Sequence, residues 1–338
     1  MNTTNPTFDP FSQPFTLQTV DGELVVANLA YLHDAVFVGT QQTIVSAVQV
    51  GASLTMLLVL LILTKADKRR QPVFWLNCSA LFFVCVAQIM ACLYYTSSWF
   101  SPYAFLTGDY SFVSPGAKAI SIIGGVSMLL LLISIETSLV LQVHVITITL
   151  DSWKRHLILA VSVTIALIAI GTRIAQLSIN MYWNVLREAY NPSVKPLVQA
   201  RDICLAISTV FFSAIFCAKL LHSLRQRKRM GLTRFGPMQV VFIGATHTLV
   251  LPALFAVLQF VVPQTHIDAL VLASVALCLP LTAVWAASVT EKPVVNAAAF
   301  GGFRTVSSAP TDASLKSPLG VGRDAVEIDL EMQGLVKL

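Results

Sequence analysis

The sequence predicts an all-α membrane protein, a bundle of seven transmembrane helices. Of its 338 residues, 56% are hydrophobic and only 12% are charged, and the mean hydropathy is +0.74. Soluble domains carry roughly a quarter charged residues, so much of this surface needs lipid around it. Seven runs approach or exceed the ~20 mostly apolar residues that a helix needs to cross a bilayer. They are 36–63, 73–95, 119–146, 157–179, 203–221, 238–262 and 267–289.

The distribution of lysine and arginine predicts the orientation, because short cytosolic loops carry an excess of both. The loops after the first, third and fifth runs hold Lys65, Lys68, Arg69, Arg70, Lys154, Arg155, Arg225, Arg227, Lys228, Arg229 and Arg234. Residues 1–36 hold none. We therefore expect the N-terminus outside and the C-terminus in the cytosol. The net charge of +5 then reports topology, and no nucleic-acid partner is expected.

Outside the spans we expect an extracellular segment at 1–36 and a cytosolic tail at 291–338, flanking a bundle at 37–290. Asp21 and Gly22 lie between two β-prone runs, which predicts a short β-hairpin. Asn2 begins a glycosylation sequon on the outer side. The tail is rich in glycine, alanine, serine and proline, so we expect disorder. Its hydroxyl groups are either phosphorylation sites or incidental.

Polar residues within the spans mark a candidate transmission core, because such residues usually face the bundle interior. At ~1.5 Å per residue, Glu136 lies roughly 16 Å above the cytosolic edge, whereas Arg173 lies roughly 28 Å above it. The same arithmetic puts His247 and Thr248 at the depth of Glu136. It also puts Asn77 level with Gln142. Separately, Pro252 and Pro280 are expected to kink their helices, because proline interrupts helical hydrogen bonding. A structural, a switching and a ligand-binding role for Glu136 all stay open at this point.

Six motifs then resemble the α-factor-type fungal mating pheromone receptors, which are class D G-protein-coupled receptors. They are QPVFWLN (71–77), FLTG (105–108), SIETSLV (134–140), MGLTRF (230–235), TLVLP (248–252) and LCLPLTAVWA (277–286). The resemblance implies a secreted peptide pheromone outside, a heterotrimeric G protein inside, a plasma-membrane location and no enzymatic activity. It also places Glu136 in the transmission core, too deep for peptide contact.

The resemblance implies two groups of site residues. The candidate ligand-binding residues are Thr40, Gln41, Gln199, Arg201, Asp202, Phe260, His266 and Asp268. The candidate G-protein contacts are Arg225, Arg227, Lys228, Arg229, Met230, Leu232 and Arg234 in the third cytosolic loop, 224–235. The cations of this loop can also serve topology or contact anionic lipid, whereas the apolar pair Met230 and Leu232 is not required for either.

A homodimer is expected from the resemblance, although Gln49 and Ser53 align with the glycines of the family's GxxxG motif. Ala47 and Gly51 keep a small-xxx-small spacing. Among other classes, a retinal protein would need a lysine within 267–289, and there is none. The alternative function is a membrane transporter, but we find no internal repeat. No catalytic residue, metal site or cofactor is predicted; Cys78, Cys85 and Cys92 recur every seven residues and are interpreted as packing residues.

Overall fold

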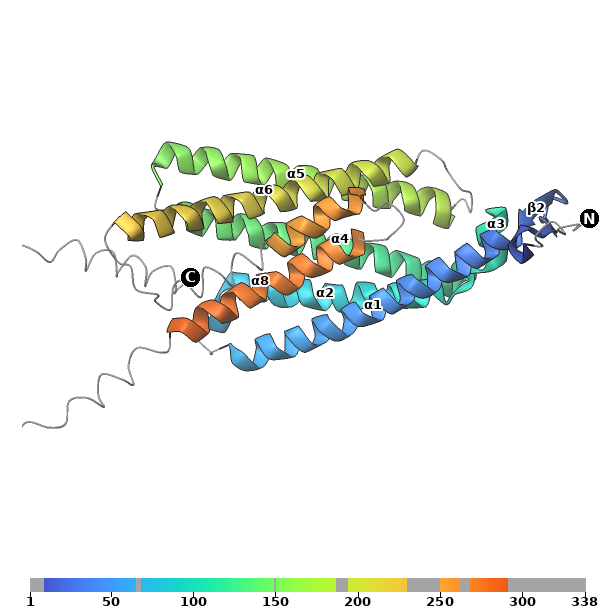
Figure 1. Ribbon diagram of the computed structural model, residues 1–338, viewed down its shortest axis with the longest axis horizontal. Coiled ribbons are helices and arrows are strands. Elements are labelled where there is room, and N and C mark those ends of the chain that lie inside the picture. Colours follow the sequence, from blue (N-terminus) through green and yellow to red (C-terminus); the bar gives the residue numbers. More distant parts are fainter. Residues whose placement is uncertain are drawn as a thin grey trace, which may run out of the picture.

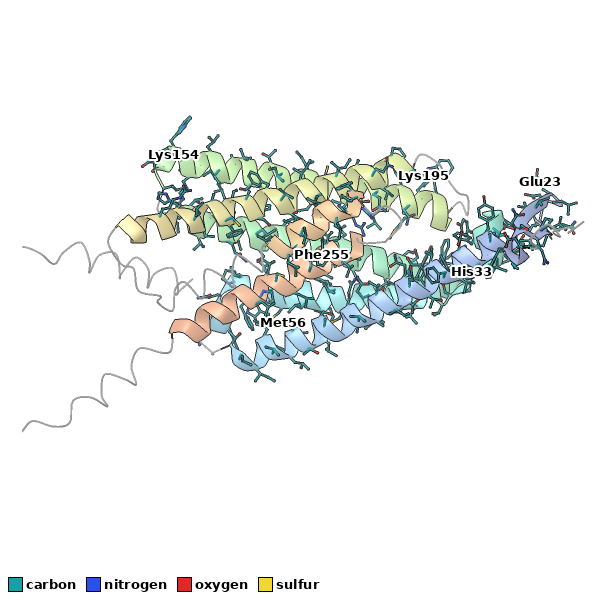
Figure 2. The ribbon with its side chains drawn as sticks, in the orientation of Figure 1. Glu23, His33, Met56, Lys154, Lys195 and Phe255 are labelled. Atoms are coloured by element: carbon teal, nitrogen blue, oxygen red, sulfur yellow. The ribbon has the colours of Figure 1, made fainter. Side chains whose placement is uncertain are left out.

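The computed structural model is a set of long helices lying lengthwise beside one another, with a small hairpin at one end (Figure 1). The structure describes residues 9–64, 68–148, 150–186, 194–229, 250–261 and 268–290. Lys154 lies at the opposite end of the helices from Glu23, His33 and Lys195 (Figure 2). This separation agrees with the sides on which the loops were predicted to lie.

The predicted hairpin is confirmed. Strands β1 (Pro14–Gln18) and β2 (Leu24–Asn28) pair antiparallel, with Gln18 opposite Leu24. Gly22 adopts a positive φ of 82° in the turn, a conformation that glycine adopts without steric cost. A short 3-10 helix, η1 (Pro10–Ser12), precedes β1, and its Phe11 ring lies 5.1 Å from the His33 ring of the first long helix. The hairpin is therefore anchored on that helix.

Helix α1 (Leu29–Leu63) begins seven residues before the predicted start, directly after β2. One face of α1 is buried at alternating spacings of three and four residues, and this face consists of Ala35, Gly39, Gln42, Ser46, Gln49, Ser53, Met56 and Leu60. Such spacing is typical of a helix that packs lengthwise along a neighbouring helix. At the other end, Arg69 of η2 (Lys68–Arg70) donates to the carbonyls of Leu61 and Thr64, which otherwise lack partners.

Helices α2 (Pro72–Tyr95) and α4 (Pro115–Thr147) form the centre, with α2 packed between α1 and α4. Their connection contains η3 (Ser98–Phe100) and α3 (Pro102–Thr107). Gly108 ends α3 in the left-handed conformation, with φ of 70°, which explains the glycine of the FLTG motif. Trp99 fastens this connection to α4 because its Nε1 donates to the carbonyl of Ala117 at 2.8 Å.

Helix α5 (Ser152–Asn180) continues into a π-helical turn, η4 (Met181–Leu186), and packs against α6 (Val194–Arg229). Two predictions need correction here. The fifth apolar run was expected over 203–221, but α6 begins at Val194, so Arg201 and Asp202 lie within the helix. The third cytosolic loop was expected to begin at 224, but α6 continues through Arg229, so the first four predicted cations are helical.

The remaining described helices are Val250–Val261 and α8 (Asp268–Thr290). The main core joins α2, α4, α6, α8 and the 250–261 helix, with Val84, Leu131, Phe212, Ala256 and Val271 almost fully buried. Within the described residues, five helices are long and apolar enough to cross a membrane. The chain is thus a multi-pass helical membrane protein, and the count of seven spans stays a prediction.

Candidate functional site

Glu136 lies in the middle of α4 and is 2% exposed. Its Oε1 accepts a hydrogen bond of 2.6 Å from the Ser208 hydroxyl of α6, whereas its Oε2 is buried without a partner among the described residues. Leu132, Ile135 and Phe212 belong to the apolar cluster around it. A carboxyl group in such surroundings is costly unless it is hydrogen-bonded. Glu136 therefore ties α4 to α6, and the position of α6 determines whether that bond forms.

Sequence reasoning missed Ser208 as the partner of Glu136. The predicted partners His247 and Thr248 lie outside the described residues. A signal for Ser208 was present, because Arg201, Leu205, Ser208 and Phe212 recur at the spacing of one helix face. The serine therefore faces inward two turns below Arg201.

A second polar layer is built as predicted, with one addition. Asn77 of α2 is 3% exposed and lies level with Gln142 of α4. Ser138 joins them, since its hydroxyl donates to Asn77 Oδ1 at 3.0 Å and accepts from Gln142 Nε2 at 3.3 Å. Ser138 itself is fully buried. This Asn77–Ser138–Gln142 chain fixes the register of α2 against α4.

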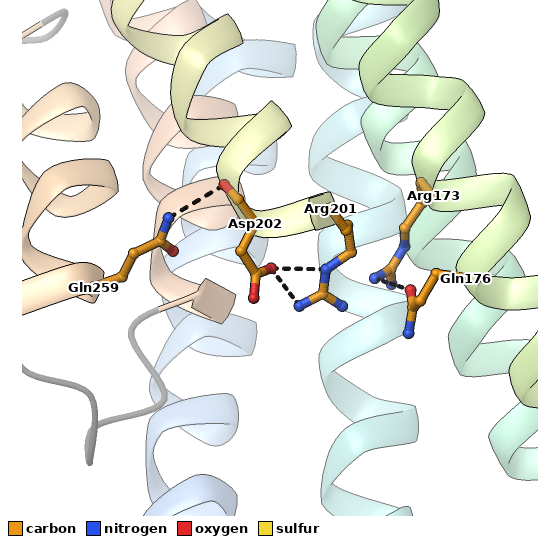
Figure 3. Close-up of polar contacts among 5 residues, drawn as sticks. All are labelled: Arg173, Gln176, Arg201, Asp202 and Gln259. Atoms are coloured by element: carbon orange, nitrogen blue, oxygen red, sulfur yellow. Dashed lines mark hydrogen bonds and ion pairs between the residues drawn. The ribbon is translucent and has the colours of Figure 1, made fainter. Parts of the chain in front are cut away.

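A polar cluster lies toward the end of the bundle that carries Lys195 (Figure 3). Arg201 Nε donates to Asp202 Oδ1 at 2.7 Å, and their side chains are only 15% and 21% exposed. Arg173 Nη1 of α5 donates to Gln176 Oε1 at 2.9 Å, and Gln259 Nε2 reaches the Asp202 carbonyl at 3.5 Å. These adjacent charges are therefore partly enclosed by three helices. Arg173, Gln176 and Gln259 were not among the predicted ligand residues.

The other predicted ligand residues lie on two separate surfaces. Thr40 and Gln41 are exposed on α1, and Thr40 lines a groove beside the end of α2. Gln199 is exposed on α6, and Phe260 is 51% exposed on the 250–261 helix. The groove that Thr40 lines includes neither Gln199 nor Phe260. His266 lies outside the described residues, and Asp268 is the first residue of α8.

The two predicted kink prolines both lie in described helices, and their kinks stay predictions. Pro280 lies inside α8 and is fully buried, so one backbone donor is missing from the interior of that helix. Pro252 is near the start of the described 250–261 helix, so a kink before it cannot be compared with the prediction. Both helices border a cavity of about 20 Å³, lined by Pro252, Thr209 and Cys278 among others.

The cytosolic candidates are described only in part. Arg225 is exposed near the end of α6. Arg227, Lys228 and Arg229 are helical, whereas Met230, Leu232 and Arg234 lie outside the described residues, as does the sequon at Asn2. At the same end of the bundle, Arg155 Nη2 of α5 lies 3.2 Å from His144 Nε2 of α4.

Comparison with known proteins identifies the family. The family described as fungal pheromone mating factor STE2 GPCR matches residues 8–287. The pheromone alpha factor receptor of Saccharomyces cerevisiae is 26% identical over 296 residues, which cover 86% of this chain and 68% of that receptor. The pheromone P-factor receptor of Schizosaccharomyces pombe is 25% identical over 295 residues, which cover 83% of this chain and 81% of that receptor. The pheromone alpha factor receptor of Lachancea kluyveri is 27% identical over 270 residues, covering 73% and 58%. Because the match extends over most of the chain, from before the hairpin into α8, this protein belongs to the STE2 family of fungal pheromone mating factor G-protein-coupled receptors.

Proposed function

We propose that this chain binds a secreted peptide pheromone at its outer face and activates a heterotrimeric G protein at its cytosolic face. Family membership and the names of its relatives, receptors for alpha factor and P-factor, support this proposal. The proposal includes seven spans, an outer N-terminus and a cytosolic tail. The basic loops after the first, third and fifth apolar runs support that orientation.

The observation that carries the mechanism is the placement of three groups on the single helix α6. Arg201 and Asp202 lie in its first turns, and Ser208, the partner of Glu136, follows Arg201 by seven residues. Seven residues span about 10 Å and two turns, so Arg201 and Ser208 share a face. Arg225 lies near the far end. A peptide that shifts the outer end of α6 therefore also shifts the Ser208–Glu136 hydrogen bond and the cytosolic cations.

The proposed peptide site centres on the Arg201–Asp202 pair, with Gln199 and Phe260 at its rim. It also includes His266 and Asp268, the latter being the first residue of α8. An ion pair that is mostly enclosed offers oriented charge to a polar peptide group, because screening by water is reduced there. We extend this site to Arg173 and Gln259, which meet the same cluster (Figure 3). Alanine at Arg201 or Asp202 is expected to weaken peptide binding at unchanged surface expression.

The proposed G-protein surface combines the cations at the end of α6 with Met230 and Leu232 just beyond it. Positive potential around an apolar pair favours a partner helix that presents apolar and acidic side chains. The double variant Met230→Ala/Leu232→Ala should abolish nucleotide exchange and preserve membrane insertion. Normal G-protein activation by this variant would assign the cations to lipid and topology instead.

The experiment that tests the function uses cells that express the full chain with a G-protein reporter, exposed to fungal peptide pheromones in turn. We expect one class of peptide to cause dose-dependent nucleotide exchange. Glu136→Gln should then change basal or maximal signalling more than peptide affinity, since Glu136 lies in the core. A large affinity loss, measured without G protein at normal surface expression, would contradict the role of Glu136. Solute flux without any nucleotide exchange would favour the transporter alternative.

A further inference from the structure

A groove with a volume of about 350 Å³ lies where the outer part of α1 passes the end of α2 and the ring of Phe100. Its walls include Val36, Thr40 and Ile44 of α1 and Thr96 after α2. We propose that this groove binds a membrane sterol. The groove lies at the edge of the packed face of α1, because Ala35 and Gly39 of that face also line it. Thr40 is also one of the predicted ligand residues, so the sterol proposal is tested below without any peptide.

The groove opens toward the bilayer. Val36, Thr40, Ile44 and Val48 follow one another at intervals of four residues and form one row along α1. Val36, Ile44 and Val48 are 55%, 59% and 66% exposed. The buried face of α1, from Ala35 to Leu60, borders this row, and its Ala35 and Gly39 form the inner side of the groove. One wall of the groove is therefore continuous with an apolar face that meets lipid, and its occupant enters from the membrane.

The depth of the groove matches the outer boundary of the hydrocarbon core. Thr40 precedes Leu63, the last residue of α1, by 23 residues (63 minus 40), which correspond to about 34 Å along the helix. The hydrocarbon core is about 30 Å thick, so Thr40 lies at its outer edge when Leu63 lies at its inner edge. Ile44, one turn below, is within the core. A sterol places its hydroxyl at this boundary and its fused rings below it.

The hydroxyl groups in the groove are acceptors for a donating ligand. Thr40 Oγ1 donates to the Val36 carbonyl at 2.8 Å, and Thr96 Oγ1 donates to the Cys92 carbonyl at 3.0 Å. With their protons used, both oxygens offer lone pairs. A sterol supplies one hydroxyl donor, whereas the headgroup of phosphatidylcholine supplies none. The chemistry therefore favours a sterol over the bulk phospholipid.

Gly39 explains how a flat wall forms at this position. A Cβ on residue 39 would lie 2.5 Å from Phe100 Cε1, so the glycine allows the aromatic ring to lie directly against α1. The ring and the adjacent helix backbone then form one rigid side of the groove. A rigid ligand such as a sterol loses little conformational freedom on binding against it.

The test uses the full-length receptor in phosphatidylcholine vesicles that contain a diazirine-bearing cholesterol analogue, with labelled peptides located by mass spectrometry. We expect labelling on the segments around Thr40 and Thr96, competed by unlabelled cholesterol. Ile44→Trp fills the groove and should reduce this labelling at least about 5-fold. Leu58→Trp is the matched control, because Leu58 is also lipid-facing on α1, at 52% exposure, but lies outside the groove.

The hydroxyl contribution is tested by Thr40→Val combined with Thr96→Val, which should raise the cholesterol concentration needed for competition roughly 2- to 10-fold. Thr55→Val is its control, since Thr55 is an exposed threonine of α1 that donates to the Gly51 carbonyl at 2.8 Å. Labelling that spreads over all lipid-facing helices, or that Ile44→Trp leaves unchanged, overturns the proposal. So does a disulfide between two Ile44→Cys copies that forms equally with and without cholesterol, because the occupant is then a second receptor. No peptide enters these assays, so they succeed or fail separately from the pheromone proposal.

Discussion

The two interfaces of α2, with α4 and with α1, differ in how completely their buried polar groups are paired. Toward α4, Asn77, Ser138 and Gln142 form a connected chain. Toward α1, the buried Ser53 Oγ lies 3.1 Å from Cys85 Sγ, but Gln49 of α1 is 4% exposed, and neither its Oε1 nor its Nε2 has a partner among the described residues. Connected groups specify one packing arrangement, whereas an unpaired buried amide costs free energy in every arrangement that leaves it unpaired. The α2–α4 interface is thus the fixed part of the bundle, and α1 is the part whose packing can change at lower cost.

Glu136 is intermediate between these two cases, and it gives the largest expected effect. Ser208→Ala removes the donor to Glu136 Oε1 and leaves a buried carboxyl with no described partner. We expect the receptor to lose about 2 kcal/mol of unfolding free energy, near the upper end for polar contacts between membrane helices, and basal signalling to change. Thermal unfolding of purified receptor and the G-protein reporter measure the two effects.

The control for that prediction is Thr209→Val on the same helix. Thr209 is also buried, but its hydroxyl donates to the Leu205 carbonyl of α6 itself. If Thr209→Val changes stability and basal signalling as much as Ser208→Ala does, the bond between α4 and α6 has no special role.

The next effect concerns the connected chain. Ser138→Ala separates Asn77 from Gln142 and should lower the free energy of unfolding by about 1–1.5 kcal/mol. Ser162→Ala is the matched control, because Ser162 is equally buried and its hydroxyl donates to the Ile158 carbonyl within α5. Equal melting temperatures for the two variants would show that the chain contributes nothing beyond local bonds.

Gln49 should respond with the opposite sign. Gln49→Leu replaces an unpaired buried amide by an apolar side chain of similar size, so we expect a gain of about 0.5–1 kcal/mol. Gln41→Leu, an exposed position on the same helix, is expected to change the melting temperature little. A clear loss of stability in Gln49→Leu would mean that this amide is paired in the membrane, and the contrast between the two interfaces would then disappear.

The smallest effect is in the connection between α2 and α4, where a half-buried carboxylate is hydrogen-bonded to hydroxyl groups. Tyr103 donates to Asp109 Oδ2 at 3.0 Å, and hydrogen bonds from Ser111 hold the pKa of Asp109 below its usual value. A depressed carboxyl pKa stabilises the fold above the unfolded pKa, and this contribution is lost as the pH falls through the folded value. Asp109→Asn should therefore make the local stability of residues 101–113 less sensitive to acid. Hydrogen exchange of those amides at pH 3 and pH 6 measures this difference, and an unchanged pH dependence contradicts it.

The sequence predicted the apolar helices well because bilayer thickness constrains them directly. The predicted run 73–95 differs from α2 by one residue, and Asp21-Gly22 identified the hairpin turn. Helix ends in water were less predictable, because hydropathy does not report where a polar helix stops. For this reason the start of α1 and both ends of α6 lie outside the apolar runs that were predicted for them. Depth arithmetic paired Asn77 with Gln142 correctly, but it did not find Ser138, since serines are common in apolar helices. Ser208 could be found only from the spacing that it shares with Arg201 and Phe212 on one helix face.

The length of α6 has a mechanical consequence. Measured from Ser208, the helix extends seven residues outward to Arg201 and 21 residues inward to Arg229, or about 10 Å and 31 Å. A rigid rod pivoting at the bond to Glu136 is a lever with arms in a ratio of about one to three. In the proposed orientation, a displacement of about 1 Å at the outer ion pair would therefore move the cytosolic end by about 3 Å, more than half of the 5.4 Å pitch of a helical turn. Ser208→Ala would remove the hydrogen bond about which α6 pivots, while leaving both ends of the helix intact.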